Sequence, residues 1–290
     1  MSHPPLRSVL YIPGARDRAL DKAKTLPADA IIFDLEDAVA PDEKPQARRL
    51  LADKLAQGGY GKRAQIVRIN ALDTPWGADD VATIAAAKPQ ALLLPKVNSA
   101  ADVCALDHMM AQHKGFENTG IWAMMETPLG ILNALDIARA PRMAGFVMGT
   151  NDLAKDLNTR FDPTRLPLVG ALSQCVLAAK AAGIAIVDGV YNAFKDDDGL
   201  RVESQQGRDF GMDGKTIIHP AQIAVVNDVF APTADEVDLA KRQIAAFDDA
   251  IAQGHGVAVV DGKIVENLHV ETARATLAKA DAIAALGAQE

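Results

Sequence analysis

The sequence predicts a TIM barrel, a (β/α)8 fold, followed by a C-terminal helix-hairpin-helix lid extension. Short apolar, β-branched segments alternate along the chain with longer Ala-, Leu- and Lys-rich segments of helical period. Some of the short segments, such as residues 30–33 and 91–94, are apolar without interruption. Such runs are typical of parallel strands that are buried on both faces. A doubly wound open sheet is the alternative arrangement of the same elements.

The order of the elements supports the barrel, because each strand candidate is followed by a helix candidate before the next strand begins. Eight strands that close on themselves through such connections give the (β/α)8 topology. The strand candidates span residues 8–13, 30–35, 64–70, 91–96, 120–126, 144–150, 183–188 and 214–219.

The barrel accounts for residues 1–230 and leaves residues 231–290 as a second domain. Residues 233–253 have the pattern of an amphipathic helix, and Thr233 with Glu236 has the spacing of a capping box. Two apolar runs then flank Asp261-Gly262, which is a strong signal for a β-hairpin. A helix over residues 268–286 closes the chain. This extension is expected to pack on a barrel, either its own or that of a neighbouring subunit.

Composition restricts the possible partners and the compartment. The 290 residues carry 30 Lys and Arg against 38 Asp and Glu, a formal net charge of −8. No global positive field exists to attract nucleic acid or an anionic membrane. No apolar run approaches the length of a spanning helix, and the first twenty residues lack the apolar core of a signal peptide. Because the two cysteines, Cys104 and Cys175, show neither metal nor disulfide spacing, we expect a cytoplasmic protein.

Polar residues stand at the carboxyl end of every predicted strand. In a barrel all eight ends share one rim, where this fold places its active site. Strand ends are also polar simply because loops are hydrated, and this alternative stays open for any single position. The residues are Gly14, Glu36 and Asp37, Arg68 and Asn70, Lys96, Glu126, Asp152, Asp188 and His219.

Two of these residues predict a metal site. Glu126 ends an otherwise apolar strand, where an unpaired charge is costly, and Asp152 follows the next strand. Magnesium prefers one or two carboxylates and completes its shell with water and ligand oxygens, so the pair suits Mg²⁺ better than zinc. The alternative for Asp152 is an N-cap of the helix that begins at Leu153.

Arg68 predicts an anion-binding position. It lies between Val67 and Ile69 in an apolar strand, where a guanidinium is preorganised to bind a carboxylate or to stabilise a developing oxyanion. The alternative is a structural salt bridge to Glu36 or Asp37. Residues 34–37 supply acids that could orient Arg68 or metal-bound water. Metal and arginine together favour chemistry near a carbonyl, through an enolate or a tetrahedral intermediate.

Several motifs resemble the citrate lyase β-subunit-like branch of the HpcH/HpaI aldolase superfamily. The matching segments are residues 8–14 (SVLYIPG), 32–39 (IFDLEDAV), 67–70 (VRIN), 125–127 (MET) and 149–153 (GTNDL). The resemblance implies a TIM barrel, magnesium held by Glu126 and Asp152, a coenzyme A thioester bound by Arg68, and trimers or hexamers in which a C-terminal lid reaches a neighbouring active site. It also favours Arg16 and Lys22 as contacts of the CoA phosphates.

Within this branch, the lid bears on which reaction is catalysed. Where related lyases of malyl-CoA carry an aspartate that acts in proton transfer, this chain has Glu266, which is longer by one methylene. With residues 188–192 and 214–220, the lid resembles that of members that hydrolyse (3S)-malyl-CoA or a close 3-hydroxyacyl-CoA. Glu266 would then activate water or shuttle a proton.

Two other functions stay open at this point. One is a lyase that cleaves malyl-CoA, β-methylmalyl-CoA or citramalyl-CoA to a 2-oxoacid and an acyl-CoA. The other is a non-catalytic subunit that binds CoA esters within a larger lyase complex.

Overall fold

The computed structural model describes residues 4–160 and 162–287. They form two compact units, one spanning Leu6–Phe230 and one that runs from Ala231 onward and includes Pro4 and Pro5. The expected outer limits of the two domains, residues 1 and 290, lie outside the described residues.

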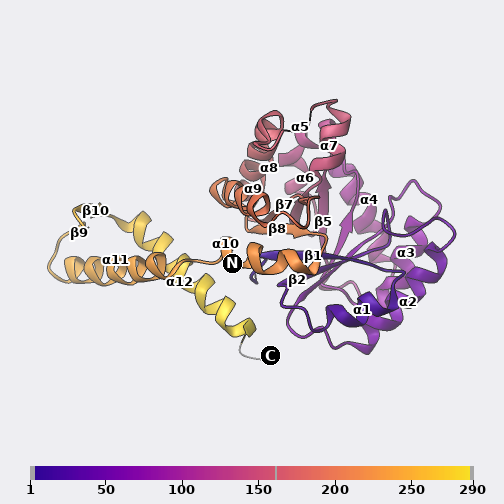
Figure 1. The fold of residues 1–290 in the computed structure, drawn as a ribbon, viewed down its shortest axis with the longest axis horizontal. Helices are drawn as coiled ribbons and strands as arrows, with labels where there is room; N and C mark the ends of the chain where they lie inside the picture. The colour runs from indigo at the N-terminus through magenta and orange to yellow at the C-terminus, as the bar shows by residue number, and fades with distance from the viewer. Residues whose placement is uncertain (1–3, 161, 288–290) are drawn as a thin grey trace. The chain divides into compact units, whose positions relative to one another are not determined.

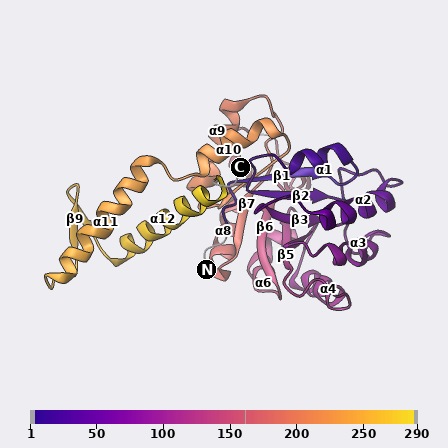
Figure 2. The same cartoon turned by 90° about the horizontal axis from the view of Figure 1, so that it is seen from below.

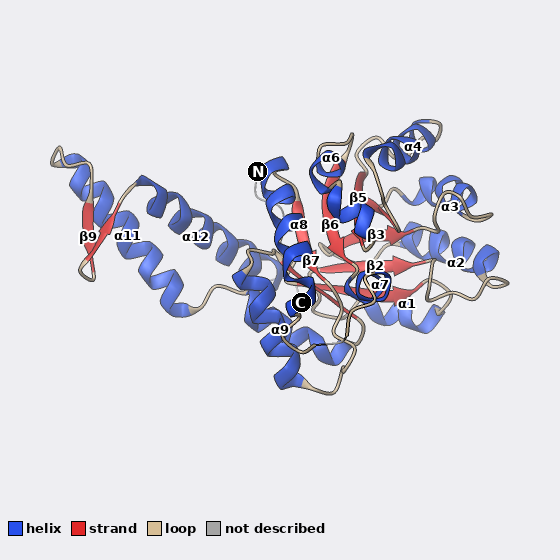
Figure 3. Ribbon diagram, turned by 90° about the horizontal axis from the view of Figure 1, so that it is seen from above, coloured by secondary structure: helices blue, strands red, loops and turns tan. Residues whose placement is uncertain are grey.

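The first unit contains a closed barrel of eight parallel strands in sequential order, β1 to β8, with β8 pairing back onto β1. Figures 1 and 3 show these strands enclosed by helices. The predicted TIM barrel is therefore confirmed, and the open-sheet alternative is wrong. The strands are β1 Ser8–Pro13, β2 Ala30–Asp34, β3 Ala64–Arg68, β4 Ala91–Leu94, β5 Gly120–Met125, β6 Met143–Met148, β7 Ala185–Asp188 and β8 Gly214–Ile217.

Helices connect successive strands on the outside of the barrel, and Figure 2 shows α1 to α4 beside the first strands. Three short 3₁₀ segments, η1 Ala85–Ala87, η2 Leu166–Leu168 and η3 Pro220–Gln222, occur between them. The helices are α1 Asp17–Ala23, α2 Lys44–Gln57, α3 Gly77–Ile84, α4 Ala100–Ala111, α5 Pro128–Leu132, α6 Ala134–Ala138, α7 Thr150–Asp156, α8 Val169–Ala182, α9 Asp197–Asp209 and α10 Ile223–Phe230.

The continuous apolar strands are explained by two separate cores. On β2, Ala30 and Ile32 belong to the cluster that fills the barrel, whereas Ile31 and Phe33 belong to the larger cluster under the helices. Successive side chains of a strand point to opposite faces, so a strand with helices outside and packed side chains inside must be apolar at every position. The same alternation decides which polar residues at the strand ends point inward.

Most predicted strands were one or two residues too long at the carboxyl end. The chain leaves the sheet where the polar rim begins, so β2 ends at Asp34, β3 at Arg68 and β5 at Met125. At the start of β7 the reason differs. Gly183 adopts φ of 70° as the C-cap of α8, so the strand starts at Ala185 and not at residue 183.

The second unit has the expected helix, hairpin and helix: α11 Ala234–Ala252, β9 Ala258–Val260, β10 Lys263–Val265 and α12 Asn267–Gly287. The Thr233–Glu236 capping box is present. Asp261 and Gly262 both have positive φ, as a tight two-residue hairpin turn requires. A small core of Ala250, Ala258, Val265 and Val270 holds the unit together. In the described parts of the chain, no helix is long and apolar enough to cross a membrane.

Candidate active site

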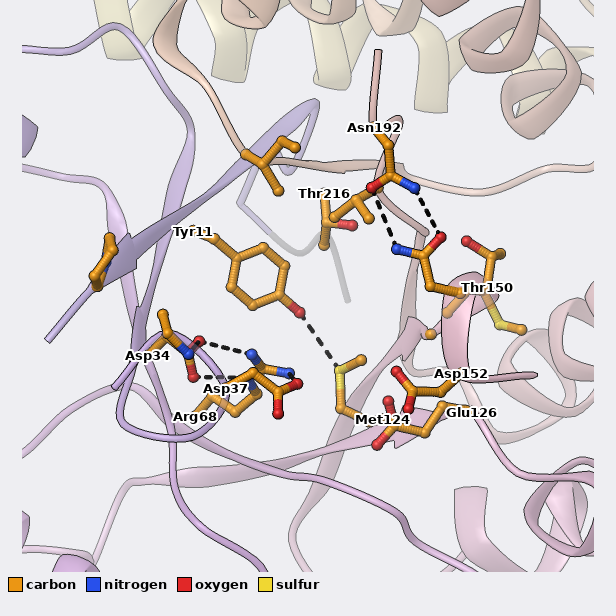
Figure 4. Close-up of a pocket in the computed structure, with 17 residues that line it drawn as sticks. Tyr11, Asp34, Asp37, Arg68, Met124, Glu126, Thr150, Asp152, Asn192 and Thr216 are labelled. Atoms are coloured by element: carbon orange, nitrogen blue, oxygen red, sulfur yellow. Dashed lines mark hydrogen bonds and ion pairs between the residues drawn. The ribbon is translucent and has the colours of Figure 1, made fainter. Parts of the chain in front are cut away.

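A cavity of about 390 Å³ opens at the carboxyl ends of the barrel strands (Figure 4). Apolar side chains form part of its wall, and the charged groups gather at or just after the carboxyl ends of β2, β3 and β5 and in the first turn of α7. Its lining comprises Tyr11, Pro13, Asp34, Asp37, Ala38, Arg68, Met124, Glu126, Met148, Gly149, Thr150, Asn151, Asp152, Val190, Asn192, Thr216 and Ile218.

The two-residue alternation of the strands brings side chains from distant parts of the sequence into this cavity. Ile66 on β3 fills the barrel, and so Arg68, two residues later, also points inward. Glu126 follows Met124 in the same way at the end of β5. The structure therefore brings together the three residues expected to form the site, Arg68, Glu126 and Asp152.

Glu126 and Asp152 lie side by side and point into the cavity (Figure 4). Glu126 is 2% exposed, and its Oε1 accepts a hydrogen bond from the Lys96 N–H at 2.7 Å. Burial raises the pKa of Glu126 to about 7, and the charge of Asp152 acts in the same direction, while the Lys96 hydrogen bond opposes both. Gly149 is required beside them, because a Cβ at this position would collide with Glu126.

Asp152 occupies the first turn of α7, whose N-cap is Gly149. The alternative in which Asp152 serves as the N-cap is therefore wrong. Its carboxylate is instead free to face Glu126 across the cavity.

The donor chemistry of this pair fits magnesium. The two carboxylates converge in the cavity, and their oxygens are the hard ligands that Mg²⁺ prefers. No group of three or more His, Cys, Asp or Glu side chains placed to hold a metal ion occurs among the described residues. A site with one or two carboxylates needs no third protein ligand, because Mg²⁺ keeps several waters or substrate oxygens.

Arg68 is held in place by a set of acids while it lines the cavity. Its Nε and Nη2 donate to Asp34 Oδ1 and Oδ2 at 2.7 and 2.6 Å. Its Nη1 lies 2.8 Å from Glu36 Oε2 and 3.5 Å from Asp37 Oδ2. The backbone N–H groups of Glu36 and Ala38 in turn fix the Asp34 carboxylate. The salt bridge and the cavity-lining position, considered above as alternatives, thus occur together.

Other rim residues are used inside the protein. Asp188 pairs with Arg165 and Lys215. Asn70 donates to Asp80 and to the Leu35 carbonyl oxygen. Three further expected rim side chains, Glu36, Lys96 and His219, are also absent from the cavity lining in the described chain. The His219 ring accepts a hydrogen bond from the Ala221 N–H.

Three residues with expected roles lie elsewhere. Arg16 is the N-cap of α1 and Lys22 is in its last turn; both are exposed, and neither is among the described residues that line the cavity. Glu266 is exposed between β10 and α12 in the second unit. The roles of all three stay predictions.

Five polar residues of the lining were not expected from the sequence: Tyr11, Thr150, Asn151, Asn192 and Thr216. Asn151 and Asn192 hydrogen bond to each other through both amides, at 3.0 and 3.3 Å. A signal for Tyr11 was available. Val9 faces the barrel interior, so the alternation of β1 directs Tyr11 inward at the rim.

Comparisons with known proteins agree with this geometry. Residues 7–220 match the HpcH/HpaI aldolase/citrate lyase family. A (3S)-malyl-CoA thioesterase of Cereibacter sphaeroides is 61% identical over 284 residues, 98% of each chain. The citrate lyase subunit beta of Escherichia coli is 36% identical over 95% of this chain and 93% of that one.

Among solved structures, CitE of Mycobacterium tuberculosis in complex with magnesium, acetoacetate and coenzyme A superposes with a TM-score of 0.80. Its sequence identity is 30%, with 97% of this chain and 99% of that chain covered. Together with the barrel and its acidic rim, these matches show that the chain belongs to the HpcH/HpaI aldolase/citrate lyase family.

Proposed function

We propose that this protein is a magnesium-dependent thioesterase that hydrolyses (3S)-malyl-CoA, or a close 3-hydroxyacyl-CoA, to the free acid and coenzyme A. The observation that carries the proposal is that Arg68 and the Glu126–Asp152 pair face each other within the same cavity. The full-length similarity to a (3S)-malyl-CoA thioesterase supports the choice of substrate and reaction.

Glu126 and Asp152 are the residues that would hold the metal. Held there, magnesium would supply positive charge that attracts the oxygens of the acyl group and offsets the negative charge of the lining. The CitE structure solved with magnesium supports this assignment.

Arg68 contributes to the chemistry at the thioester. A water oxygen forms a bond to the thioester carbon, and the carbonyl electron pair moves onto oxygen, where the guanidinium stabilises the charge. The electron pair then returns from oxygen to re-form the carbonyl bond, the carbon–sulfur bond breaks, and sulfur leaves with the electrons of that bond. Glu266 would take a proton from the water and pass it to the sulfur, which yields acid and thiol. Asp34 acts through Arg68, because it holds two of the guanidinium nitrogens.

Glu266 belongs to the second unit, for which we propose the role of a lid in a homotrimer or hexamer that reaches the active site of a neighbouring subunit. Val259, Ile264 and Leu268, close to Glu266 in sequence, are each more than half exposed. An apolar surface of this kind favours contact with another surface. Arg16 and Lys22 are the cations that we assign to the CoA phosphates.

The cytoplasm is the compartment that we propose. Both cysteines, Cys104 and Cys175, are free thiols, and an oxidising compartment would not be needed for the fold.

The test is an assay of the purified protein with magnesium and (3S)-malyl-CoA. Hydrolysis releases free thiol and malate, and chelation of the metal stops it. The similarity of this chain to citrate lyase subunit beta favours a lyase as the second candidate function. Formation of glyoxylate and acetyl-CoA without free thiol would establish that lyase and reject the thioesterase.

Glu266→Gln tests the lid acid separately. We expect turnover to fall while the magnesium concentration for half-maximal activity stays unchanged, because the acid transfers protons and does not bind metal. The exposed Glu271→Gln, five residues further along α12, is the matched control. A variant that loses magnesium affinity and regains full activity at high metal would contradict the assigned role.

A further inference from the structure

The Tyr11 hydroxyl is a hydrogen-bond donor in the cavity that lacks an oxygen or nitrogen partner among the described residues. Figure 4 shows it directed between Arg68 on one side and the Glu126–Asp152 pair on the other. Among the described residues it donates to the Met124 Sδ, at 3.5 Å. A thioether is a weak acceptor, and a phenol in a half-buried position usually finds a stronger one. The geometry therefore leaves this donor available to a ligand.

The ring of Tyr11 is fixed independently of its hydroxyl. The Arg68 Cζ lies 5.1 Å from the ring centroid, within the range of a cation–π contact. Packing against the guanidinium holds the ring in one orientation, so the hydroxyl is preorganised beside Arg68 and not dependent on the sulfur contact.

Arg68 itself has little donor capacity left. A guanidinium carries five N–H groups. Nε and one Nη2 hydrogen are given to Asp34, and Nη1 faces Glu36 and Asp37. At least one Nη2 hydrogen makes no hydrogen bond to these acids and remains for a substrate oxygen. An oxygen that gains a full negative charge is better stabilised by two donors, and the arginine can supply one.

The other polar side chains of the lining are either engaged or on another wall. Thr216 donates to the Asp188 carbonyl oxygen at 2.8 Å, and Asn151 and Asn192 hydrogen bond to each other. The Thr150 side chain lies against Gly189. Tyr11 is thus the donor positioned next to the free edge of Arg68.

We propose that the Tyr11 hydroxyl is a catalytic hydrogen-bond donor that, with Arg68, forms the oxyanion site for the thioester oxygen. This inference rests on the proposed thioesterase function. As water adds to the thioester carbon, the carbonyl electron pair moves to oxygen between the two donors. When the carbon–sulfur bond breaks, the pair returns. Tyr11 keeps its proton throughout, so the overall reaction is still thioester plus water to acid plus thiol.

Tyr11→Phe removes the hydroxyl and keeps the ring over Arg68. We expect kcat for thiol release from malyl-CoA to fall about 100- to 1000-fold, the usual effect of losing one oxyanion donor, while KM changes less than threefold. Tyr60→Phe is the matched control. The Tyr60 hydroxyl donates to the Leu20 carbonyl oxygen outside the cavity, so its loss should leave kcat unchanged.

Two kinetic results would overturn the inference. One is a kcat of Tyr11→Phe within threefold of the original protein. The other is a rise in KM at constant kcat, because it would show a hydroxyl that binds the substrate and does not stabilise the oxyanion.

Binding of a tetrahedral probe decides the matter without turnover. A CoA thioether that carries a trifluoromethyl ketone hydrates to a tetrahedral form, and we expect Tyr11→Phe to bind it at least tenfold more weakly than the original protein in the presence of magnesium. Equal affinity would reject the role of Tyr11. If the original protein binds the probe but releases no thiol, the proposed function is rejected. The role of Tyr11 is then judged from probe affinity alone.

Discussion

Two clusters of charge lie in the barrel near the rim, and they differ in the balance of cations and anions. In the first, Lys215 and Arg165 meet Asp188 and Glu203, two cations with two anions. In the second, the cavity lining carries four carboxylates, Asp34, Asp37, Glu126 and Asp152, against the single guanidinium of Arg68.

The pKa values of the acids differ between the two clusters in the same sense. Burial alone would raise the pKa of Asp188, but Lys215 and Arg165 outweigh it and hold that pKa below its usual range. Burial raises the pKa of Glu126 to about 7 and that of Glu36, which lies against Arg68, to about 8. In the Lys215 cluster the cations equal the acids in number, whereas the cavity cluster has one cation for four carboxylates. An excess of carboxylates over cations, and not burial of charge as such, therefore distinguishes the cavity from the Lys215 cluster.

Breaking the cavity cluster should have the largest effect on function. Glu126→Gln removes one of the two metal-binding carboxylates with little change in shape, and we expect thiol release to fall about 1000-fold or more. The melting temperature without magnesium should stay the same or rise, because a costly buried charge is removed. Activity with saturating magnesium and thermal melting measure the two effects. Near-normal turnover would exclude the metal site.

Breaking the balanced cluster should instead affect stability. Lys215 is fully buried, with Nζ contacts to Asp188 Oδ2, Glu203 Oε1 and the Gly189 carbonyl oxygen. Lys215→Met leaves two buried acids, Asp188 and Glu203, with Arg165 as the one remaining cation of the cluster, and should lower the free energy of unfolding by about 3–5 kcal/mol.

Denaturant unfolding measures this loss, and Lys180→Met serves as its control. Lys180 forms a half-exposed pair with Asp213, and removing such a pair should cost about 0–1 kcal/mol. Equal losses of unfolding free energy in Lys215→Met and Lys180→Met would show that the buried Lys215 cluster is no more important for stability than an exposed ion pair.

A smaller effect is expected where an acid acts through Arg68. Asp34→Asn keeps one acceptor oxygen of the two that hold Nε and Nη2, so the guanidinium can rotate away from the substrate. We expect kcat to fall about 100-fold, since a displacement of about 1 Å has effects of that size. Arg201, whose exposed partner is Asp228, offers a control: Asp228→Asn should leave kcat unchanged. A normal kcat for Asp34→Asn would mean that Glu36 and Asp37 position Arg68 without it.

Acid titration should show the smallest effect. Because the folded protein holds the pKa of Asp188 below the value of about 3.9 in an unfolded chain, its contribution to stability is complete above about pH 4 and is lost as the pH falls below that value. Unfolding free energies measured between pH 6 and pH 3 should therefore decline less steeply in Asp188→Asn than in the original protein. Parallel declines would show that Asp188 is not held in its charged form by Lys215 and Arg165.

Much of the fold could be predicted because local patterns encode it. Apolar runs gave all eight strands to within two residues at most ends, and the Asp261-Gly262 pair gave the hairpin. Three members of the cavity, Arg68, Glu126 and Asp152, could also be predicted, because a charge at the end of an apolar strand has few structural explanations.

Which rim charges stay available could not be predicted in the same way. Asp188 and Glu126 look alike in the sequence, each an acid at the end of an apolar strand. Asp188 is neutralised by Arg165, which comes from the loop before α8, and by Lys215 on the neighbouring strand. Such partners are set by how loops fold over the rim, and no local pattern encodes them.

Local sequence patterns specify the barrel, the helix-hairpin-helix unit and the identity of the charged residues at the rim, since periodicity and strand-end polarity are properties of neighbouring residues. Long-range contacts specify which of those charges are paired, that the Tyr11 hydroxyl faces a thioether, and that Asp34 holds Arg68. These depend on closure of the barrel, which places side chains far apart in the chain within hydrogen-bonding distance in a medium where an unpaired charge is costly.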